Sequence, residues 1–509
     1  MASGRWMRRR ATGWVARGAW SVAFIIVAAA AWPTPAARAS EAGTDPPADC
    51  VLPHGGLQGA IDFDTYIRPA GPVRGVMLFV DFADAPATET PEDAWAPLMP
   101  MAADWMRLSS DDKVSLDVTP VLRWLRMPEP LSAYALTASG SLQSAAGRRY
   151  IDQAIALADP EVDFSDYRIV YIVPAAEAAA LKRASAWTSN PGSGTLADGV
   201  KIRHAVTFGV TLYTRGYGVM DHETSHLFGL PDLYAADSPT DRYVAIWDIM
   251  GDSRIANDHM AWSKWRLGWL DDDQVDCVNQ AGETDHTLWS LAWTGGTKAV
   301  VLRTGPDTAI VAEYRTMETL DRDVCSTGVL VYRVDNKAAR LAGPVRVVDA
   351  DPSTVVGSGT CEDQLDDAAF GVGASWVDPD TGITIGVTGT HDGGAVDLHV
   401  TRPASFAAPV RYARSLKAQA KANASGTSTL TGTLTASKKF AKCQAGRKVS
   451  LQQLRYGAWV TLRTAATNPA GTWKYTWTPE PGTYRLKAIA TWTGDWYCLP
   501  AFSRPIDLP

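Results

Sequence analysis

The stretch HETSHLFGLPD, from His222 to Asp232, constrains the local fold more tightly than any other part of the sequence. His222 and His226 are four residues apart, so both imidazoles project from the same face of an α-helix. Gly229 can adopt the positive φ angle that ends a helix, and Pro231 cannot continue one. The stretch therefore predicts a helix that stops at the glycine and a turn that leads back toward the histidines.

The same residues have the chemistry of a catalytic zinc site. Two neutral imidazoles at this spacing can bind one Zn²⁺, and the turn would return the Asp232 carboxylate as a third ligand. Glu223 follows the first histidine, where it can take a proton from water without binding the metal. A bare HExxH also occurs by chance on amphipathic helices, so the glycine and the aspartate favour the site. Three protein ligands leave the open position that a hydrolytic zinc ion needs.

The pattern HExxHxxGxxD followed by a methionine is the arrangement of the metzincins. Met250, in AIWDIMGDS, is predicted to form the methionine turn that lies under the zinc in that class, and the alternative is a methionine that only fills the core. Many metzincins have a tyrosine two residues later, which helps to hold the transition-state oxyanion, but here Asp252 occupies that position. Tyr217, Tyr234 and Tyr243 are the candidate substitutes, and the sequence does not choose between them.

The N-terminus has the three parts of a secretory signal peptide, which are a basic start, an apolar run and a small-residue cleavage site. The basic start contains Arg5, Arg8, Arg9 and Arg10. The apolar run AWSVAFIIVAAAA is shorter than the ~20 residues of a spanning helix, which argues against a membrane anchor. AARAS then offers cleavage after Ala39. We expect a secreted, extracellular protein with no stable membrane insertion after this cleavage.

All six cysteines follow the predicted cleavage site, and they are Cys50, Cys277, Cys325, Cys361, Cys443 and Cys498. An even number in an exported chain predicts disulfides, and none has the CxxC spacing of a metal site. Proximity within the predicted domains favours Cys325–Cys361 and Cys443–Cys498, which leaves Cys50 for Cys277. The alternative is that the Cys50 thiolate caps a metal ion in a latency segment, which would leave Cys277 unpaired.

Hydrophobic patterning divides the chain after the signal peptide (1–39) into three domains. Residues 40–280 alternate buried strands, such as VRGVMLFVDF and YRIVYIVPA, with amphipathic helices, such as Gly147–Ala158, which predicts an α/β catalytic domain. Residues 281–405 contain short β segments without helical periodicity, which predicts a β-sandwich. An Ala-, Pro- and Lys-containing linker is expected at 406–426. The alternating segments of 427–509 predict an immunoglobulin-like β module.

Several segments together resemble the secreted immune inhibitor A-type metallopeptidases. They are HETSHLFGLPDLY, WDIMG, AWSKWRLGWL, VMLFVDFAD, VDFSDYRIVYIVPA and VAEYRT…GVLVYRVDN, so the resemblance covers roughly residues 70–405. It implies a bacterial, secreted, zinc-dependent endopeptidase with an α/β zincin domain of metzincin type and a β-rich domain behind it. It also implies that His222 and His226 bind zinc and that Glu223 is the general base. Asp232 matches the family's GLPD segment, where either this aspartate or a later carboxylate is the third ligand.

The resemblance raises three further points. Members of the family tend to have an N-terminal pro-segment, but only residues 40–72 separate the predicted cleavage from the first strand, so a full pro-domain is not expected. Members also tend to bind structural Ca²⁺, for which Asp271, Asp272 and Asp273 are candidates; the alternative is a solvated acidic turn. His259, in ANDHMAW, is either a substrate-side histidine, another metal ligand, or a histidine that lies at the surface or has its hydrogen bonds satisfied within its loop.

Composition and motifs argue against several classes of partner and function. A net charge of −7 and a pI of about 5.7 argue against nucleic acid and anionic membranes as partners. There is no G-x-S-x-G and no phosphate-binding glycine loop, so serine hydrolase and nucleotide-binding functions lack support.

We predict a zinc metalloendopeptidase that cleaves extracellular proteins or peptides. Two alternatives are a catalytically inactive adhesion protein on a protease scaffold, against which the intact HExxH argues, and a zinc hydrolase of cell-wall amide bonds. The ligand of the C-terminal module is not indicated.

Overall fold

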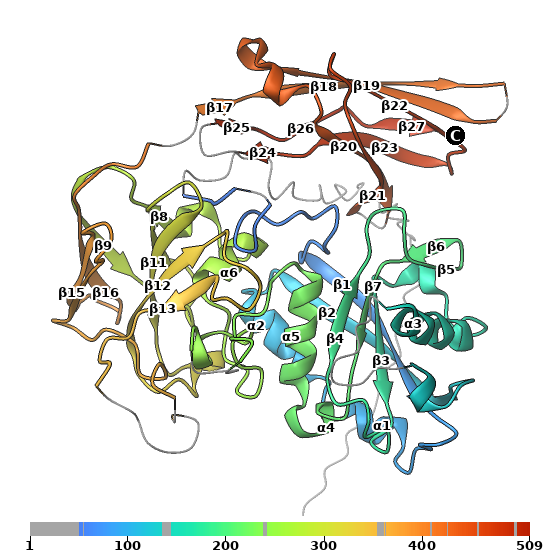
Figure 1. Cartoon of the computed structure of the whole chain (residues 1–509), viewed down its shortest axis with the longest axis horizontal. Helices are drawn as coiled ribbons and strands as arrows, with labels where there is room; N and C mark the ends of the chain where they lie inside the picture. The colour runs from blue at the N-terminus through green and yellow to red at the C-terminus, as the bar shows by residue number, and fades with distance from the viewer. Residues whose placement is uncertain are drawn as a thin grey trace, which may run out of the picture. The chain divides into compact units, whose positions relative to one another are not determined.

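β-Sheets dominate the architecture of this chain (Figure 1). In a computed structural model, strands account for 37% of the structure and helices for 17%. The structure describes residues 50–53, 55–134, 144–237, 242–353, 361, 363–407, 410–424, 426–455, 458–492 and 496–508. The predicted signal peptide, residues 1–39, lies outside the described residues. Within those ranges, no helix is both long and apolar enough to cross a membrane.

The N-terminal part is built around a five-stranded sheet with the strand order β2-β1-β3-β7-β4. Its strands are β1 (Gly71–Asp81), β2 (Val114–Arg126), β3 (Ile169–Pro174), β4 (Ser185–Thr188) and β7 (His204–Thr207). The pairs from β2 to β7 are parallel, whereas β4 is antiparallel to β7 and forms one edge of the sheet. A short hairpin of β5 (Thr195–Ala197) and β6 (Val200–Ile202) follows β4 in the sequence.

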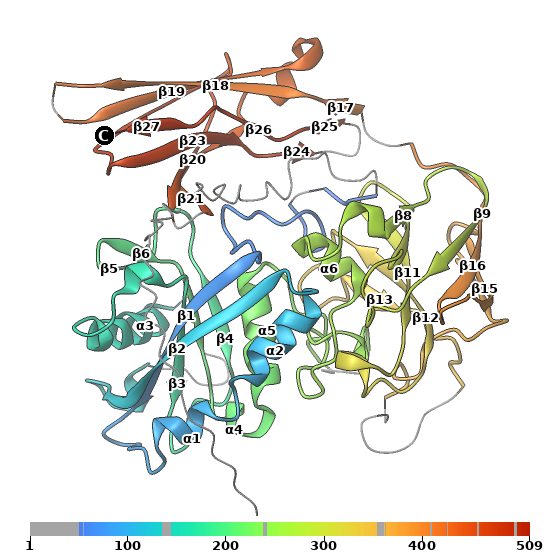
Figure 2. The same ribbon diagram turned by 180° about the vertical axis from the view of Figure 1, so that it is seen from behind.

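Helices cover both faces of this sheet because its central strands are apolar on both sides. In β1, Met77 and Phe79 belong to one core and Leu78 and Val80 to another. The helices are α1 (Pro91–Trp95), α2 (Met101–Ser109), α3 (Ala145–Ala158), α4 (Leu212–Arg215), α5 (Tyr217–Leu227) and α6 (Ala261–Leu267). Helices α2 and α5 contribute to the first core and α3 to the second, so α3 lies on the opposite side of the sheet from α2 and α5 (Figure 2).

The elements expected in this part are present, with shifted bounds. The predicted helix 147–158 corresponds to α3, which begins two residues earlier because the Ser144 hydroxyl accepts a hydrogen bond from the Gly147 N–H at 3.0 Å. The predicted strands near residues 73–82 and 167–175 correspond to β1 and β3. Strands β4, β5 and β6 were not expected, because three or four residues are too few to display an alternating pattern.

Two further sheets follow. One has the order β13-β12-β11-β10-β8 and the other the order β14-β15-β16-β9. Their strands are β8 (Val275–Cys277), β9 (Gly282–Leu288), β10 (Ala299–Arg303), β11 (Thr308–Arg315), β12 (Gly328–Asp335), β13 (Val345–Val347), β14 (Ser375–Val377), β15 (Thr384–Thr390) and β16 (Val396–Arg402).

The first of these two sheets packs on both of its faces. Along β11, Val311 lies in the core that also contains α2 and α5, whereas Ile310 and Ala312 lie in the core shared with the second sheet. Successive strand residues point to opposite faces, so a continuous apolar run is what a sheet buried on both sides requires. The region after residue 280 therefore shares one hydrophobic core with the region before it.

The C-terminal residues form small sheets around a core of their own. Their strands are β17 (Val410–Tyr412), β18 (Arg414–Ala422), β19 (Ser428–Ala436), β20 (Lys448–Arg455), β21 (Ala458–Ala466), β22 (Thr472–Trp477), β23 (Gly482–Ala488), β24 (Thr491–Trp492), β25 (Trp496–Cys498), β26 (Ala501–Phe502) and β27 (Ile506–Leu508). The linker predicted at 406–426 is wrong, because β18 pairs with β19 along its whole length. Leu416 and Ala418 point inward at strand spacing, and the exposed Lys417 and Lys421 of the same strand conceal that pattern.

All three predicted disulfides are confirmed: Cys50–Cys277, Cys325–Cys361 and Cys443–Cys498. The bond between Cys50 and Cys277 rules out the alternative in which a Cys50 thiolate caps a metal ion. These bonds are consistent with secretion into an oxidising environment.

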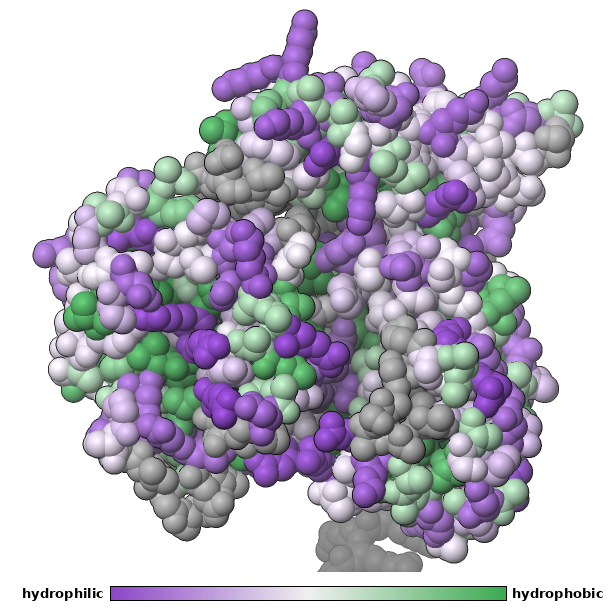
Figure 3. Space-filling view, in the orientation of Figure 1, coloured by the Kyte–Doolittle hydropathy of each residue, from purple (hydrophilic) through white to green (hydrophobic). Residues whose placement is uncertain are grey.

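Large hydrophobic side chains at the surface are scattered rather than gathered. Those exposed among the described residues are Met101, Leu108, Leu122, Leu196, Met317, Val372, Val377, Val410 and Leu454. In the face shown in Figure 3, hydrophilic and hydrophobic residues are interspersed. Single exposed hydrophobic residues are normal on a protein surface and by themselves indicate no partner.

Candidate metal centre

Helix α5 carries the two histidines of the predicted site, and it ends as the sequence predicts. Gly229 has a φ angle of 101°, and its N–H donates to the carbonyl of His226 at 3.0 Å. A Cβ atom at this position would lie 2.7 Å from Ile61, so both the backbone angle and the available space require glycine. The chain then turns back, and the Leu230 N–H donates to the carbonyl of Ser225 at 3.1 Å.

Both imidazoles are oriented by hydrogen bonds to backbone carbonyls. His222 Nδ1 lies 2.9 Å from the carbonyl oxygen of Ile249, and His226 Nδ1 lies 2.7 Å from that of Leu230. A carbonyl oxygen can only accept, so each Nδ1 carries the proton and each Nε2 presents its lone pair. Hydrogen bonds of this kind fix the ring orientation and the tautomer of metal-binding histidines.

The two Nε2 atoms converge on one carboxylate oxygen of Asp232. Asp232 Oδ1 lies 3.3 Å from His222 Nε2 and 3.1 Å from His226 Nε2. Ligands bound tetrahedrally at 2.0–2.1 Å stand about 3.3 Å apart, so these separations fit a small metal ion. The same separations also fit a proton held between imidazole and carboxylate. Among the described residues, these three form the one group of His, Cys, Asp or Glu side chains close enough to hold a metal ion.

The electrostatics of the group favour a positive charge between its members. Burial raises the pKa of Asp232, but the two histidines outweigh that effect and hold it well below its usual range. Burial lowers the pKa of His226, yet the charge of Asp232 and its hydrogen bond raise that pKa to about 9. Both directions express one interaction, in which a buried carboxylate stabilises a cation beside it.

Glu223 lies beside this group without belonging to it. Glu223 is only 8% exposed, and the helix that carries it packs against β4. Burial raises the pKa of Glu223, although the neighbouring histidines act in the opposite direction. A carboxylate with a raised pKa beside a metal site has the properties of a general base.

Met250 lies in a turn that contacts both helix α5 and the chain that turns back after Gly229. The carbonyl of Met250 accepts a hydrogen bond from the Leu233 N–H at 2.9 Å, and the preceding carbonyl, of Ile249, accepts from His222. Asp248 holds the turn, because its carboxylate accepts a hydrogen bond from the Met250 N–H at 2.8 Å. The contacts of this turn are therefore made mainly by its backbone.

Of the three candidate tyrosines, Tyr234 lies at the site. Its ring stacks on that of His222 with the centroids 6.4 Å apart, and burial together with the nearby Asp232 carboxylate raises the pKa of its hydroxyl. Tyr243 instead packs against the guanidinium of Arg346, and Tyr217 lies at the opposite end of α5 from His226. The tyrosine two residues after Asp232 in the sequence thus takes the position beside the site.

His259 is fully buried, and both of its ring nitrogens have partners. Nε2 lies 3.0 Å from the Ser225 hydroxyl on α5, and Nδ1 lies 2.9 Å from Asp248 in the methionine-containing turn. His259 is therefore a satisfied internal histidine rather than a ligand, and it joins the histidine helix to that turn. Sequence reasoning missed the connection because Ser225 and Asp248 have no spacing that links them to position 259.

Two of the three acidic residues considered for calcium have partners within the protein. Asp271 caps the short helical turn that follows it and pairs with Lys113 at 2.9 Å, and Asp272 accepts a hydrogen bond from the Trp265 indole at 2.8 Å. These contacts account for Asp271 and Asp272 without a bound ion. Structural Ca²⁺ stays a prediction.

Comparisons with known proteins do not add to these observations. No protein-family model matches the sequence, and no curated protein is detectably similar to it. The function must therefore be argued from the residues of the site.

Proposed function

We propose that this protein is a secreted zinc-dependent endopeptidase, with an α/β zincin domain of metzincin type, a β-sandwich and an immunoglobulin-like module. The observation that carries the proposal is the convergence of two Nε2 lone pairs on Asp232 Oδ1, with Glu223 beside them. The mixed sheet with α5 on one face and the turn around Met250 support the metzincin comparison. The three disulfides support an extracellular location.

The residues that would hold Zn²⁺ are His222 and His226 through Nε2 and Asp232 through Oδ1. A bound zinc ion lowers the pKa of water to about 7 and polarises a carbonyl group. Glu223 accepts the proton of the attacking water and delivers it to the amine that leaves when the peptide bond breaks. Tyr234, whose hydroxyl lies at Asp232, is the donor best situated to stabilise the negative charge that develops on the carbonyl oxygen.

An extended peptide has a suitable binding edge next to Glu223. Strand β4 pairs with β7 on one side, and within the described residues no other strand pairs with it. Helix α5, which carries Glu223, packs against β4, so this strand lies near the proposed general base. Backbone groups at an open sheet edge can bind a peptide of almost any sequence, which suits an endopeptidase acting on proteins.

Zinc dependence is the test of this proposal. We expect the purified secreted protein to contain about one zinc ion per chain and to cleave casein. Dialysis against a chelator should abolish cleavage, and stoichiometric Zn²⁺ should restore it. The reason is that hydrolysis needs the zinc ion and the water at its open coordination position. Zinc bound without cleavage of casein would instead favour an inactive protein or a hydrolase of other amide bonds. No bound zinc would contradict the proposal.

Asp232→Ala tests the third ligand. We expect zinc affinity to fall by more than the ~10–100-fold that is typical of substitutions outside the ligand set. Equilibrium competition with a chromophoric chelator measures the change, and thermal unfolding of the metal-free protein checks the fold. Unchanged affinity would move the role of third ligand to another carboxylate.

A further inference from the structure

Arg340 reaches the metal centre from a different sheet. It lies in the connection between β12 and β13, and its guanidinium contacts the Asp232 oxygen that faces away from the histidines. Nη2 lies 2.6 Å and Nε 3.2 Å from Asp232 Oδ2. The aspartate is 1% exposed, whereas the arginine side chain is 68% exposed. The two carboxylate oxygens thus have separate partners, with the histidines on Oδ1 and Arg340 on Oδ2.

The connection that carries Arg340 is fixed at its base. Asn336 is buried and donates to the carbonyl of Pro53 at 2.9 Å, while its side-chain oxygen accepts from the Gln58 N–H at 3.0 Å. Its own N–H donates to the carbonyl of Asp307 at 2.8 Å. A Cβ at Gly56 would lie 1.9 Å from the Asn336 carbonyl oxygen, so the two segments are in close contact. Arg340 therefore projects from an anchored loop despite its exposed side chain.

We infer that Arg340 is a positioning residue for the metal centre, which selects the Asp232 oxygen offered to the metal. An isolated carboxylate can rotate, exchange its two oxygens or bind through both. A guanidinium that occupies Oδ2 through two N–H donors removes this freedom and leaves Oδ1 facing both Nε2 atoms. This inference rests on the proposed zinc function. It means that the sheet β13-β12-β11-β10-β8 contributes a residue to the site through the connection between β12 and β13.

If only its charge mattered, Arg340 would weaken zinc binding rather than support it. A guanidinium near a divalent cation repels it, so Coulomb's law predicts that a neutral residue at position 340 would tighten zinc binding. If Arg340 acts by positioning, the same substitution weakens zinc binding. The sign of the change therefore separates the two explanations.

The experiment measures zinc affinity in the full secreted chain. We expect Arg340→Gln to raise the zinc dissociation constant by about 10–100-fold, the range for partners of metal ligands. Arg340→Lys should lie between the parent and Arg340→Gln, because an ammonium keeps the charge but lacks the planar pair of donors. Lys337→Gln is the matched control. It removes one positive charge from the same loop, where Lys337 is 76% exposed and pairs with Asp307 at 2.6 Å, and should leave the affinity unchanged.

Two readouts besides catalysis make the result decisive. Competition with a chromophoric chelator gives the zinc dissociation constant, and the visible spectrum of the Co²⁺-substituted protein reports the ligand geometry, which Arg340→Gln should alter and Lys337→Gln should not. Thermal unfolding of the metal-free variants verifies the fold. Unchanged or tighter zinc binding by Arg340→Gln would overturn the inference and leave the proposed function standing. Absence of zinc from the parent chain would overturn both.

Discussion

Replacing Glu223 with glutamine is expected to lower kcat for casein or a peptide substrate by about 10²–10⁴-fold, the contribution typical of a general base. Glutamine keeps the shape of the side chain and can still accept a hydrogen bond, but it cannot take up a proton. Zinc content should not change, because Glu223 lies outside the group of three candidate ligands. Steady-state kinetics and metal analysis on the same preparation measure the two quantities.

A surface carboxylate provides the control for this substitution. Glu161→Gln removes a negative charge from an exposed pair with Arg123 and should leave both kcat and zinc content at the parent values. If Glu223→Gln cleaved as fast as the parent, Glu223 would not be the base. If it lost zinc together with activity, Glu223 would be a ligand, and the assignment of the site would have to change.

The local part of the site could be predicted because its chemistry lies within one short stretch. Helical spacing brings His222 and His226 to one face, and Gly229 and Pro231 dictate where the helix ends, so the return of Asp232 follows from backbone geometry. The disulfides were predictable for a similar reason, since few pairings were compatible with the expected domains.

The rest of the site could not be predicted because it depends on tertiary contacts. Arg340 is 108 residues from Asp232, and nothing in the sequence around it marks it as a partner of a metal ligand. Strand β4 is short and partly polar, yet it packs against the helix that carries Glu223. The linker prediction failed for a different reason, since the lysines of β18 conceal its inward-facing Leu416.

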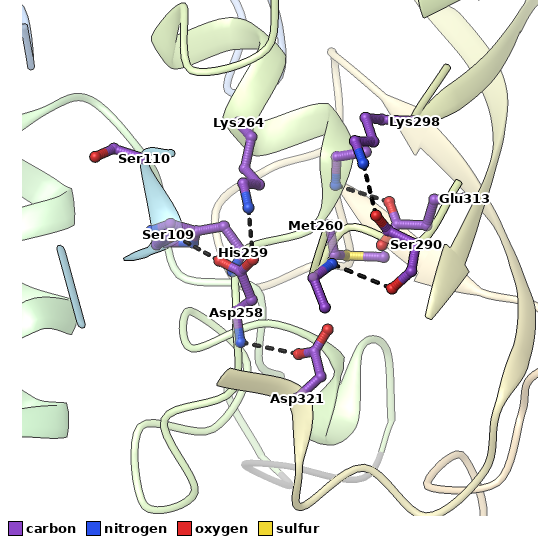
Figure 4. A network of polar contacts seen from close by, with 12 residues as sticks. Ser109, Ser110, Asp258, His259, Met260, Lys264, Ser290, Lys298, Glu313 and Asp321 are labelled. Carbon is purple, nitrogen blue, oxygen red and sulfur yellow. Dashed lines mark hydrogen bonds and ion pairs between the residues drawn. The ribbon is translucent and has the colours of Figure 1, made fainter. Parts of the chain in front are cut away.

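Buried polar contacts connect the metal centre to the rest of the fold. Ser225, on the histidine helix, contacts His259, which contacts Asp248 in the turn that orients His222. The neighbouring Asp258 accepts from Ser109 at 2.5 Å and pairs with Lys264 at 2.5 Å (Figure 4). Networks of satisfied buried polar groups hold one arrangement of a core, so the orientation of the candidate zinc ligands depends on residues outside the candidate site.

Arg315→Met is expected to cause the largest loss of stability. Arg315, in β11, is fully buried between two acidic side chains, with Glu313 at 3.0 Å and Asp321 at 2.7 Å, and it also donates to the Trp247 carbonyl at 2.9 Å. Removing it leaves two carboxylates buried without their cation, a change that costs about 3–5 kcal/mol of unfolding free energy. Denaturant unfolding measures this difference. The exposed pair of Arg123 supplies the control, since Arg123→Met should cost no more than about 1 kcal/mol.

The stability deficit of Arg315→Met should grow as the pH rises. Burial raises the pKa of Glu313 and of Asp321, and among the neighbours that oppose this rise Arg315 has the largest effect. Without Arg315 both folded-state pKa values move further above their unfolded values. The folded variant then binds more protons than the unfolded chain, so its stability decreases with rising pH, from the unfolded pKa near 4 up to the raised folded values. The difference in unfolding midpoint between Arg315→Met and the parent should therefore be larger at pH 8 than at pH 5. A deficit that is equal at both values would mean that the two carboxylates find other cations or water, and that Arg315 contributes through packing alone.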